Sequence, residues 1–222
     1  MAEDIWNLIA LVSQAKEELR GCGITTLTIE RDFFQLLELA KSKQGLEYQH
    51  FDPHRIPQLK KRGFWICGRN EQDEIVHFQG CRHDDLGDGN LEDYMADIWP
   101  RLNSGIPVWD LPIARDVTGA AVYHGSLWIR KDLRRNTAGT WATRLGMLLA
   151  HGEYNADAIY GTATQQLALS PYGLSQGYSI AQPIALDWVE PSPWGNYWCF
   201  IVPNAHVQRL LRAGFEQYAP SK

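Results

Sequence analysis

Hydrophobic residues spaced three to four positions apart predict helices near both ends of the chain. The first helix is expected over residues 4–19, and the second over residues 33–43, where Asp32 can cap the start and Gly45 follows the end. A last helix is expected after Asn204, which can cap it. The expected buried stripes are Ile5, Leu8, Ile9, Val12 and Leu19 in the first helix and Val207, Leu210, Leu211 and Phe215 in the last.

Alternating apolar and β-branched positions predict strands in the first half of the chain. One strand is expected in residues 23–30, and residues 63–85 are typical of a hairpin with a polar turn. The segment 83–90 is acidic and contains glycine, which favours a solvated turn. Residues 91–102 then predict a short helix that stops near Pro100.

The second half alternates strands and helices. A long strand is expected over residues 119–133, and its interior Gly125 indicates a bulge or a close backbone approach. Simple alternation places Val122, His124, Ser126, Trp128 and Arg130 on one face and Tyr123, Leu127 and Ile129 on the other. Further elements are expected as a helix within 134–152, strands at 156–165, 180–188 and 196–203, and a broken helix or turn at 166–178.

The segment 134–152, RRNTAGTWATRLGMLLAHG, joins a basic turn to an amphipathic helix. Trp141, Leu145, Leu148 and Leu149 form its core-facing stripe, and Asn136 or Thr137 can cap its first turn. The amides and dipole of a helix start attract an anion, and Arg130, Arg134 and Arg135 would add positive charge. Two interpretations stay open at this point, a cradle for an anion and a well-capped surface helix.

Composition narrows the class of protein. The 222 residues carry a net charge of −5, so a phosphorylated small molecule suits the local basic clusters at 60–62 and 130–135 better than nucleic acid does. No apolar run approaches about 20 residues, and the N-terminal segment lacks a basic n-region, so neither a membrane span nor a secretory leader is expected. The scattered cysteines Cys22, Cys67, Cys81 and Cys199 favour reduced thiols and a cytoplasmic location.

The histidines and acidic residues do not have the spacing of a metal site. His50 and His54 flank a short turn, and Cys81 and His83 follow Cys67 by 14 and 16 positions. Neither set supplies four ligands at the spacing of structural zinc, and residues 83–90 lack the register of a calcium loop. We expect no metal.

The order of these elements resembles the Gcn5-related N-acetyltransferase superfamily, the acyl-CoA-dependent N-acyltransferases. In that family a loop of form Arg/Gln-x-x-Gly-x-Gly/Ala follows the fourth strand and holds the pyrophosphate of coenzyme A at a helix N-terminus. The matching residues here are Arg134, Arg135, Asn136, Thr137, Ala138 and Gly139, with Thr140 next. Thr137 stands where the first glycine is expected, and a frame shifted by one residue misses both glycines.

The resemblance implies the fold and much of the site. It implies a single domain over residues 1–222 with its core at about 24–203, in which helices flank a mixed, mostly antiparallel sheet. The central strands would splay apart, and the first and last helices would be additions. Acetyl-CoA or another acyl-CoA would be the co-substrate, and its pantetheine would lie along the backbone of Leu127, Trp128 and Ile129.

Two residues are candidates for proton transfer. The family carries a segment like Tyr-Glu-Lys-x-Gly-Phe, which the longer segment 172–178 resembles, so Tyr172 would be the general acid. His124 is the candidate base, because it lies mid-strand beside the expected splay and neutral imidazole accepts protons near pH 7. A buried histidine bonded to a neighbour is the alternative, and Asp110, Asp116 and Glu74 are weaker candidates.

The leading functional hypothesis is N-acyl transfer to a small amine or an amino-acid-like acceptor. The tryptophans that would line the acceptor pocket, or else the core, are Trp109, Trp128, Trp188, Trp194 and Trp198. An acyl-homoserine-lactone synthase on the same fold is one alternative, although Arg31 and Phe33 stand without the tryptophan that group shows. A non-catalytic ligand-binding or partner-binding module is another. A homodimer is possible for any of these.

Overall fold

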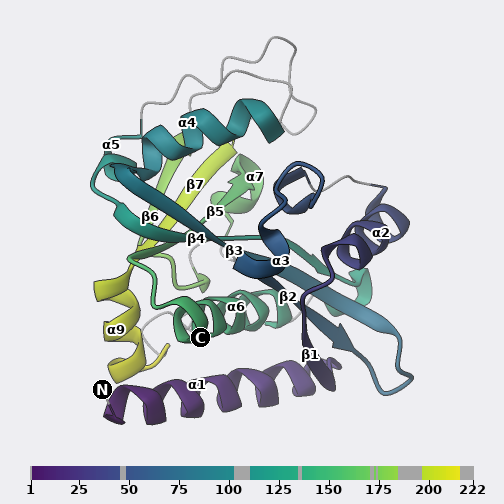
Figure 1. Cartoon of the computed structure of the whole chain (residues 1–222). Coiled ribbons are helices and arrows are strands. Elements are labelled where there is room, and N and C mark those ends of the chain that lie inside the picture. Colours follow the sequence, from purple (N-terminus) through teal and green to yellow (C-terminus); the bar gives the residue numbers. More distant parts are fainter. Residues whose placement is uncertain are drawn as a thin grey trace.

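The computed structural model describes residues 2–45, 49–102, 111–134, 137–170, 173, 175–184 and 197–215 (Figure 1). A seven-stranded sheet runs through these residues in the order β1-β2-β3-β4-β5-β7-β6. The strands are β1 (Thr26–Glu30), β2 (Gly63–Arg69), β3 (Ile75–Asn90), β4 (Thr118–Ile129), β5 (Ala158–Thr164), β6 (Ile180–Ile184) and β7 (Tyr197–Pro203). The α-helices are α1 (Ala2–Gly21), α2 (Phe33–Gln44), α3 (Leu59–Arg62), α4 (Leu91–Leu102), α5 (Pro112–Arg115), α6 (Ala138–Tyr154), α7 (Gln165–Ala168) and α9 (Asn204–Ala213). Two short 3₁₀ turns, η1 (Gln49–Phe51) and η2 (Lys131–Leu133), precede α3 and α6.

The sheet is antiparallel except at its centre. β4 and β5 are parallel, because α6 crosses over between them, and the other neighbouring strands are antiparallel. The predicted mixed α/β class with a mostly antiparallel sheet is confirmed. The predicted splay is present too: β4 pairs with β5 only from Ala121 to Tyr123, then continues beside β3, while β5 continues beside β7 to Thr164.

A β-bulge in β4 lies next to Gly125, as the interior glycine predicts. The β3–β4 register passes from Phe78↔Trp128 to Gly80↔Gly125, so β4 contains one extra residue there. Ser126 adopts a positive φ of 55° in this bulge. Beyond the extra residue, each side chain of β4 lies on the face opposite to the one that simple alternation predicts. Trp128 therefore lies in the same core as Tyr123, and the predicted alternation was wrong from Ser126 onward.

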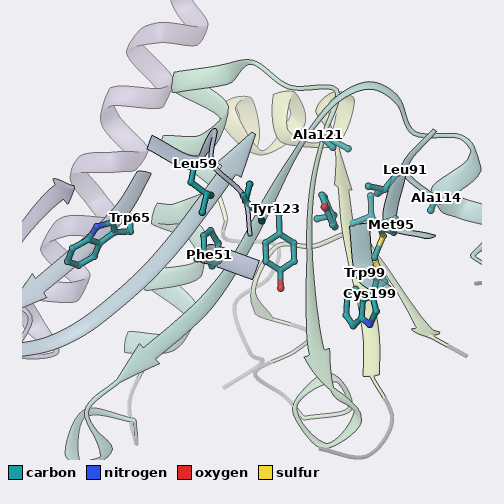
Figure 2. Close-up of a cluster of buried hydrophobic side chains, with 14 of the residues drawn as sticks. Phe51, Leu59, Trp65, Leu91, Met95, Trp99, Ala114, Ala121, Tyr123 and Cys199 are labelled. Carbon is teal, nitrogen blue, oxygen red and sulfur yellow. The ribbon is translucent and has the colours of Figure 1, made fainter. Parts of the chain in front are cut away.

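Helices cover both faces of the sheet (Figure 1). α6 lies between the sheet and α1, and α9 packs near the N-terminal end of α1. α2, α3 and α4 cover the opposite face, where Figure 2 shows Met95 and Trp99 together and Phe51 beside Tyr123. We call these the α6 face and the α4 face. Each face has its own buried hydrophobic cluster, so the central strands are apolar on both sides.

Several local predictions are confirmed at the level of single residues. Asp32 caps α2 by accepting hydrogen bonds from the amides of Phe34 and Gln35 at 3.0 and 3.4 Å. Gly45 ends the same helix in the left-handed conformation that glycine tolerates. The predicted buried stripe of α9, Val207, Leu210, Leu211 and Phe215, is buried on the α6 face.

Other local predictions were wrong. Ile5 and Ile9 of α1 are exposed, because α1 contacts α6 through Leu11, Ala15 and Leu19 instead. α4 continues past Pro100 to Leu102, and the segment 83–90 completes strand β3 rather than forming a turn. The N-cap position of α9 is Pro203, not Asn204. Among the described helices, none is long and apolar enough to cross a bilayer.

Candidate active site at the splay of β4 and β5

The candidate site is built around the point at which β4 and β5 part. Tyr123 and Tyr160 form the last ladder pair, and His124 and Gly161 follow them. A Cβ on Gly161 would lie 2.5 Å from the backbone oxygen of His124. Glycine is therefore required for the close approach of the two strands immediately before they diverge.

On the α4 face, Tyr123 covers this point. Its hydroxyl lies 3.1 Å from Oγ1 of Thr162, so the two side chains link β4 to β5. The ring lies over Gly125, where an added Cβ would come within 2.9 to 3.0 Å of three ring and hydroxyl atoms. The expected close approach at Gly125 is thus made by a tyrosine side chain, and burial raises the pKa of Tyr123.

On the α6 face, His124 occupies the equivalent place. Its Nδ1 lies 3.1 Å from the Tyr178 hydroxyl, and its Nε2 lies 2.9 Å from Oε1 of Gln79. Gln79 is itself fully buried and donates from Nε2 to the carbonyl of Ala142 in α6 at 2.7 Å. The three side chains form one hydrogen-bonded row between the sheet and α6.

His124 is beside the splay as predicted, and it is also a buried histidine bonded to neighbours. Burial, with a smaller effect from His77, lowers the pKa of His124 to about 4. The imidazole is therefore neutral near pH 7, and its protonated form gives up a proton readily. A residue with this pKa is a weak base, so any proton that it accepts is held briefly.

Tyr172, the predicted acid, lies outside the described residues. Besides Tyr123 and Tyr160, the structure brings Tyr178 to the splay, six positions after Tyr172. Its hydroxyl would lie 3.2 Å from a Cβ on Gly161, and its ring packs against Phe200. Sequence reasoning missed Tyr178 because it occupies the place of the phenylalanine in the family segment.

The segment that carries Tyr178 is fastened to the first turns of α6. Ser175 Oγ lies 2.9 Å from Oγ1 of Thr140, and Arg144 donates to the Ser175 carbonyl at 2.9 Å. Arg144 is buried and packs against the rings of Trp141 and Phe215. Burial lowers its pKa to about 10. Arg144 lies three positions after Trp141 and four before Leu148, so helical spacing already places it beside the predicted buried stripe, although the sequence analysis did not single it out.

The start of α6 is partly as predicted. Thr137 is at the N-cap position and is exposed, but within the described residues its side chain makes no capping hydrogen bond. Its Oγ1 lies 3.8 Å from Sγ of Cys22 instead. Ala138 is buried, Gly139 and Thr140 are half-buried, and Arg135 and Asn136 lie outside the described residues.

Of the three arginines expected near this helix start, the structure describes Arg130 and Arg134. Arg130 is paired with Asp132 and with Glu74, at 2.8 Å to each, so its charge is compensated. Arg134 donates from Nε to the carbonyl of Ile129 at 2.7 Å, which holds the basic turn against the end of β4. Glu74, a weaker base candidate, belongs to this surface ion-pair group, and Asp110 lies outside the described residues.

The strip expected to face pantetheine is the second half of β4. Leu127 is half-buried, Trp128 stacks on Phe78 with ring centroids 5.0 Å apart, and Ile129 is buried on the α6 face. The Trp128 carbonyl lies 3.1 Å from Nδ1 of His77. Trp128 is therefore a core residue, while Trp109, Trp188 and Trp194 lie outside the described residues.

A buried charged cluster lies on the α4 face of the same strands. Arg82 donates from Nε and Nη2 to the two carboxylate oxygens of Asp84 at 2.6 and 2.9 Å. Tyr160 and Tyr94 donate to that carboxylate at 2.7 and 2.8 Å. Each carboxylate oxygen of Asp84 thus accepts two hydrogen bonds. The cluster joins β3, β5 and α4 on the α4 side of the splay. Sequence analysis missed it because it assigned residues 83–90 to a turn.

Comparison with known proteins adds a likeness of fold. No family model and no curated protein matches the chain. Solved structures that it resembles include NAA60 of Arabidopsis thaliana in complex with acetyl-CoA (TM-score 0.49, 9% identity, 80% of this chain and 98% of that one). Others are ElaA of Escherichia coli (0.49, 15%, 79% and 97%) and FeeM, an N-acyl amino acid synthase from uncultured soil microbes (0.47, 11%, 81% and 92%).

The resemblance predicted from the sequence is confirmed for the fold by the topology itself. The mixed, mostly antiparallel sheet, the splay and bulge of β4, the helix between β4 and β5 and the two late strands are the features that it implied.

Proposed function

We propose that the protein is an acyl-CoA-dependent N-acyltransferase, with acetyl-CoA as the expected donor and a small amine or amino-acid-like compound as acceptor. The observation that carries the proposal is the splay of β4 from β5 after Tyr123, in the two strands that the crossover helix α6 connects. Diverging parallel strands expose backbone groups that an extended, amide-containing molecule can pair with. Pantetheine is such a molecule.

The diphosphate of the donor is proposed to bind at the start of α6. The amides of Thr137, Gly139 and Thr140 belong to the first turn, where the helix dipole favours negative charge. Arg134 lies at the turn that leads into this helix. Arg135 and Asn136 complete the proposed site, and the Thr137 side chain replaces the glycine of the family loop.

From that end, the pantetheine would follow the edge of β4 along Leu127, Trp128 and Ile129 toward His124. This path brings the thioester to the point where the strands part, between the tyrosines of the two faces. Alignment of amine and thioester would lower the barrier by about 7–11 kcal/mol at best. Proton transfer is assigned to His124 and Tyr172.

Two measurements test the proposal. Thermal unfolding is followed with coenzyme A, acetyl-CoA and acetyl-pantetheine, which lacks the diphosphate. A ligand at 100 times its Kd stabilises the folded protein by about 2.7 kcal/mol, so the two CoA compounds should raise Tm and acetyl-pantetheine should raise it much less. Thiol release from acetyl-CoA is then measured across a panel of amines.

The outcomes separate the candidate functions. A shift in Tm together with amine-dependent thiol release supports the transferase. A shift without thiol release indicates a ligand-binding module, and no shift with any acyl-CoA overturns the donor site. Activity that requires an acyl carrier protein and S-adenosylmethionine would favour the lactone-synthase alternative.

A further inference from the structure

We propose that the Tyr178 hydroxyl carries the proton from the acceptor nitrogen to the leaving sulfur, and that His124 and Gln79 position it and share that proton. This inference rests on the proposed acyl transfer. It assigns Tyr178 and Gln79, neither of which the family segment indicates, and it changes His124 from a direct base into a partner of Tyr178.

The hydrogen bonds fix the direction of each donor. Only the amide nitrogen of Gln79 can donate to the Ala142 carbonyl, so its oxygen faces His124. Nε2 of His124 must then carry the hydrogen, and Nδ1 is left as an acceptor in the neutral ring. The proton of the Tyr178 hydroxyl is consequently directed at Nδ1 of His124.

The place of the hydroxyl suits a reacting centre. It lies on the α6 face at Gly161, the first β5 residue beyond the β4–β5 ladder. Gly177, with a φ of 105°, turns the chain immediately before Tyr178, and Ser175 is held by Thr140 and Arg144. The same helix that is proposed to bind the diphosphate therefore also sets the position of Tyr178.

The proton balance closes without another reactant. The amine nitrogen attacks the thioester carbon, the C–N bond forms, and the π electrons of the carbonyl move to its oxygen. The nitrogen now carries a positive charge and becomes acidic. Tyr178 accepts that proton while its own proton passes to Nδ1 of His124. When the C–S bond breaks, His124 returns the proton through Tyr178 to the thiolate, so amide and free thiol are released and the enzyme is unchanged.

One hydroxyl can serve both atoms because nitrogen and sulfur are bonded to the same carbon in the intermediate. Burial of His124 favours the second proton transfer, because a buried imidazole holds a proton weakly and so returns it to the thiolate. Positioned proton transfer of this kind is worth about 10²- to 10⁴-fold in rate.

The first test is Tyr178→Phe, which keeps the ring against Phe200 and removes the hydroxyl. We expect kcat for amine-dependent thiol release to fall about 100-fold, with KM for acetyl-CoA within about twofold of wild type. Tyr154→Phe is the matched control, since Tyr154 is another partly buried tyrosine on the α6 face, and it should keep wild-type kcat. Wild-type turnover that survives Tyr178→Phe overturns the relay alone, whereas absence of turnover in the wild type overturns the proposed function.

The second test separates a relay from independent contributions. His124→Gln retains an acceptor oxygen but cannot take up a proton. The double variant with Tyr178→Phe should lose no more than the larger single loss, because the two groups act as one unit. If the fold-loss in kcat of the double variant equals the product of the two single losses, the two groups act independently and the relay is overturned.

A third measurement needs no turnover. Nitrogen-15 spectra of the histidine rings at neutral pH should show the Nε2–H form for His124, and Tyr178→Phe should shift its Nδ1 resonance. A ring protonated at Nδ1 would overturn the assignment, even in a protein whose activity is intact.

Discussion

The hydroxyl of Tyr178 lies 3.1 Å from Nδ1 of His124, although 54 positions separate the two residues in the chain. The contact joins the segment after β5 to the middle of β4 at the point where these strands part. It also leaves His124 with a hydrogen-bond partner on each ring nitrogen, the second being Gln79. The buried hydrogen bonds hold His124 in its neutral form, so protonation of the ring should destabilise the fold.

The first prediction concerns pH. Burial lowers the pKa of both His77 and His124 to about 4, below the ordinary value of 6.5. Between these values the unfolded chain binds protons that the folded chain does not, so the free energy of unfolding falls as the pH is lowered from about 6.5 to about 4. The slope is at most about 1.4 kcal/mol per pH unit for each histidine.

Urea unfolding at several pH values across this window measures the slope. His124→Gln should reduce this slope by the contribution of one histidine. An equal slope in wild type and His124→Gln would show that His124 is not held neutral by the fold.

The second prediction concerns the packing of α6 on His124. A Cβ on Gly146 would overlap Nε2 of His124 and displace the ring from Gln79. Gly146→Ala should destabilise the protein by about 1–3 kcal/mol, despite the helix preference for alanine, and should reduce turnover. Gly152→Ala on the same helix meets only a flexible methyl of Leu8 at 3.0 Å. Measured by chemical unfolding, the free energy of unfolding of Gly152→Ala should equal that of the wild type or exceed it by up to about 1 kcal/mol.

The third prediction distinguishes an anion site from an ordinary helix cap. Asp at the exposed Thr137 position should stabilise the ligand-free protein by about 0.5–1 kcal/mol, since aspartate caps helices and complements the dipole. The same carboxylate should repel the diphosphate, so the rise in Tm with coenzyme A should be lost. Thr137→Asn supplies a neutral cap and should retain binding. If Thr137→Asp binds coenzyme A as the wild type does, the diphosphate lies elsewhere.

The elements were predictable because local pattern and local chemistry specify them. The cap at Asp32, the hairpin and the strand–helix–strand unit around α6 all follow from spacing and turn residues. The faces of β4 beyond Gly125 were not predictable, because one bulged residue at Ser126 reverses the alternation and moves Trp128 into the core with Tyr123. Periodicity does not detect a single inserted residue.

The point at which β4 and β5 part was predictable, because the strand and its interior glycine indicate it. The same reasoning placed His124 beside that point. The contacts of Tyr178, Gln79 and Arg144 were not predictable, because they join elements that lie far apart in the chain. A tyrosine after a glycine turn carries no local sign of the histidine that it will meet.

The fourth prediction concerns the charged cluster beneath the splay. Asp84→Asn preserves the shape of the side chain but leaves the Arg82 guanidinium, which is 1% exposed, without its counter-charge. Loss of one partner of a buried pair costs about 3–5 kcal/mol, so the midpoint of urea unfolding should fall markedly. The neighbouring Asp85→Asn removes an exposed carboxylate 3.7 Å from Arg62 and should change stability by less than about 0.5 kcal/mol. Equal effects of the two variants would contradict a specific role for the buried pair.

The last prediction concerns the bulge that starts the divergence of the strands. Ser126 has a φ of 55°, which glycine adopts without strain and which β-branched residues rarely adopt. Ser126→Gly should therefore be tolerated, whereas Ser126→Val should destabilise the protein by about 1–2 kcal/mol. Because a flattened bulge would also return Leu127 and Trp128 to the opposite faces, Ser126→Val should broaden the unfolding transition and weaken the Trp128–Phe78 stacking seen by near-UV circular dichroism. A fully stable Ser126→Val with an unchanged spectrum would mean that the strand does not depend on this backbone conformation.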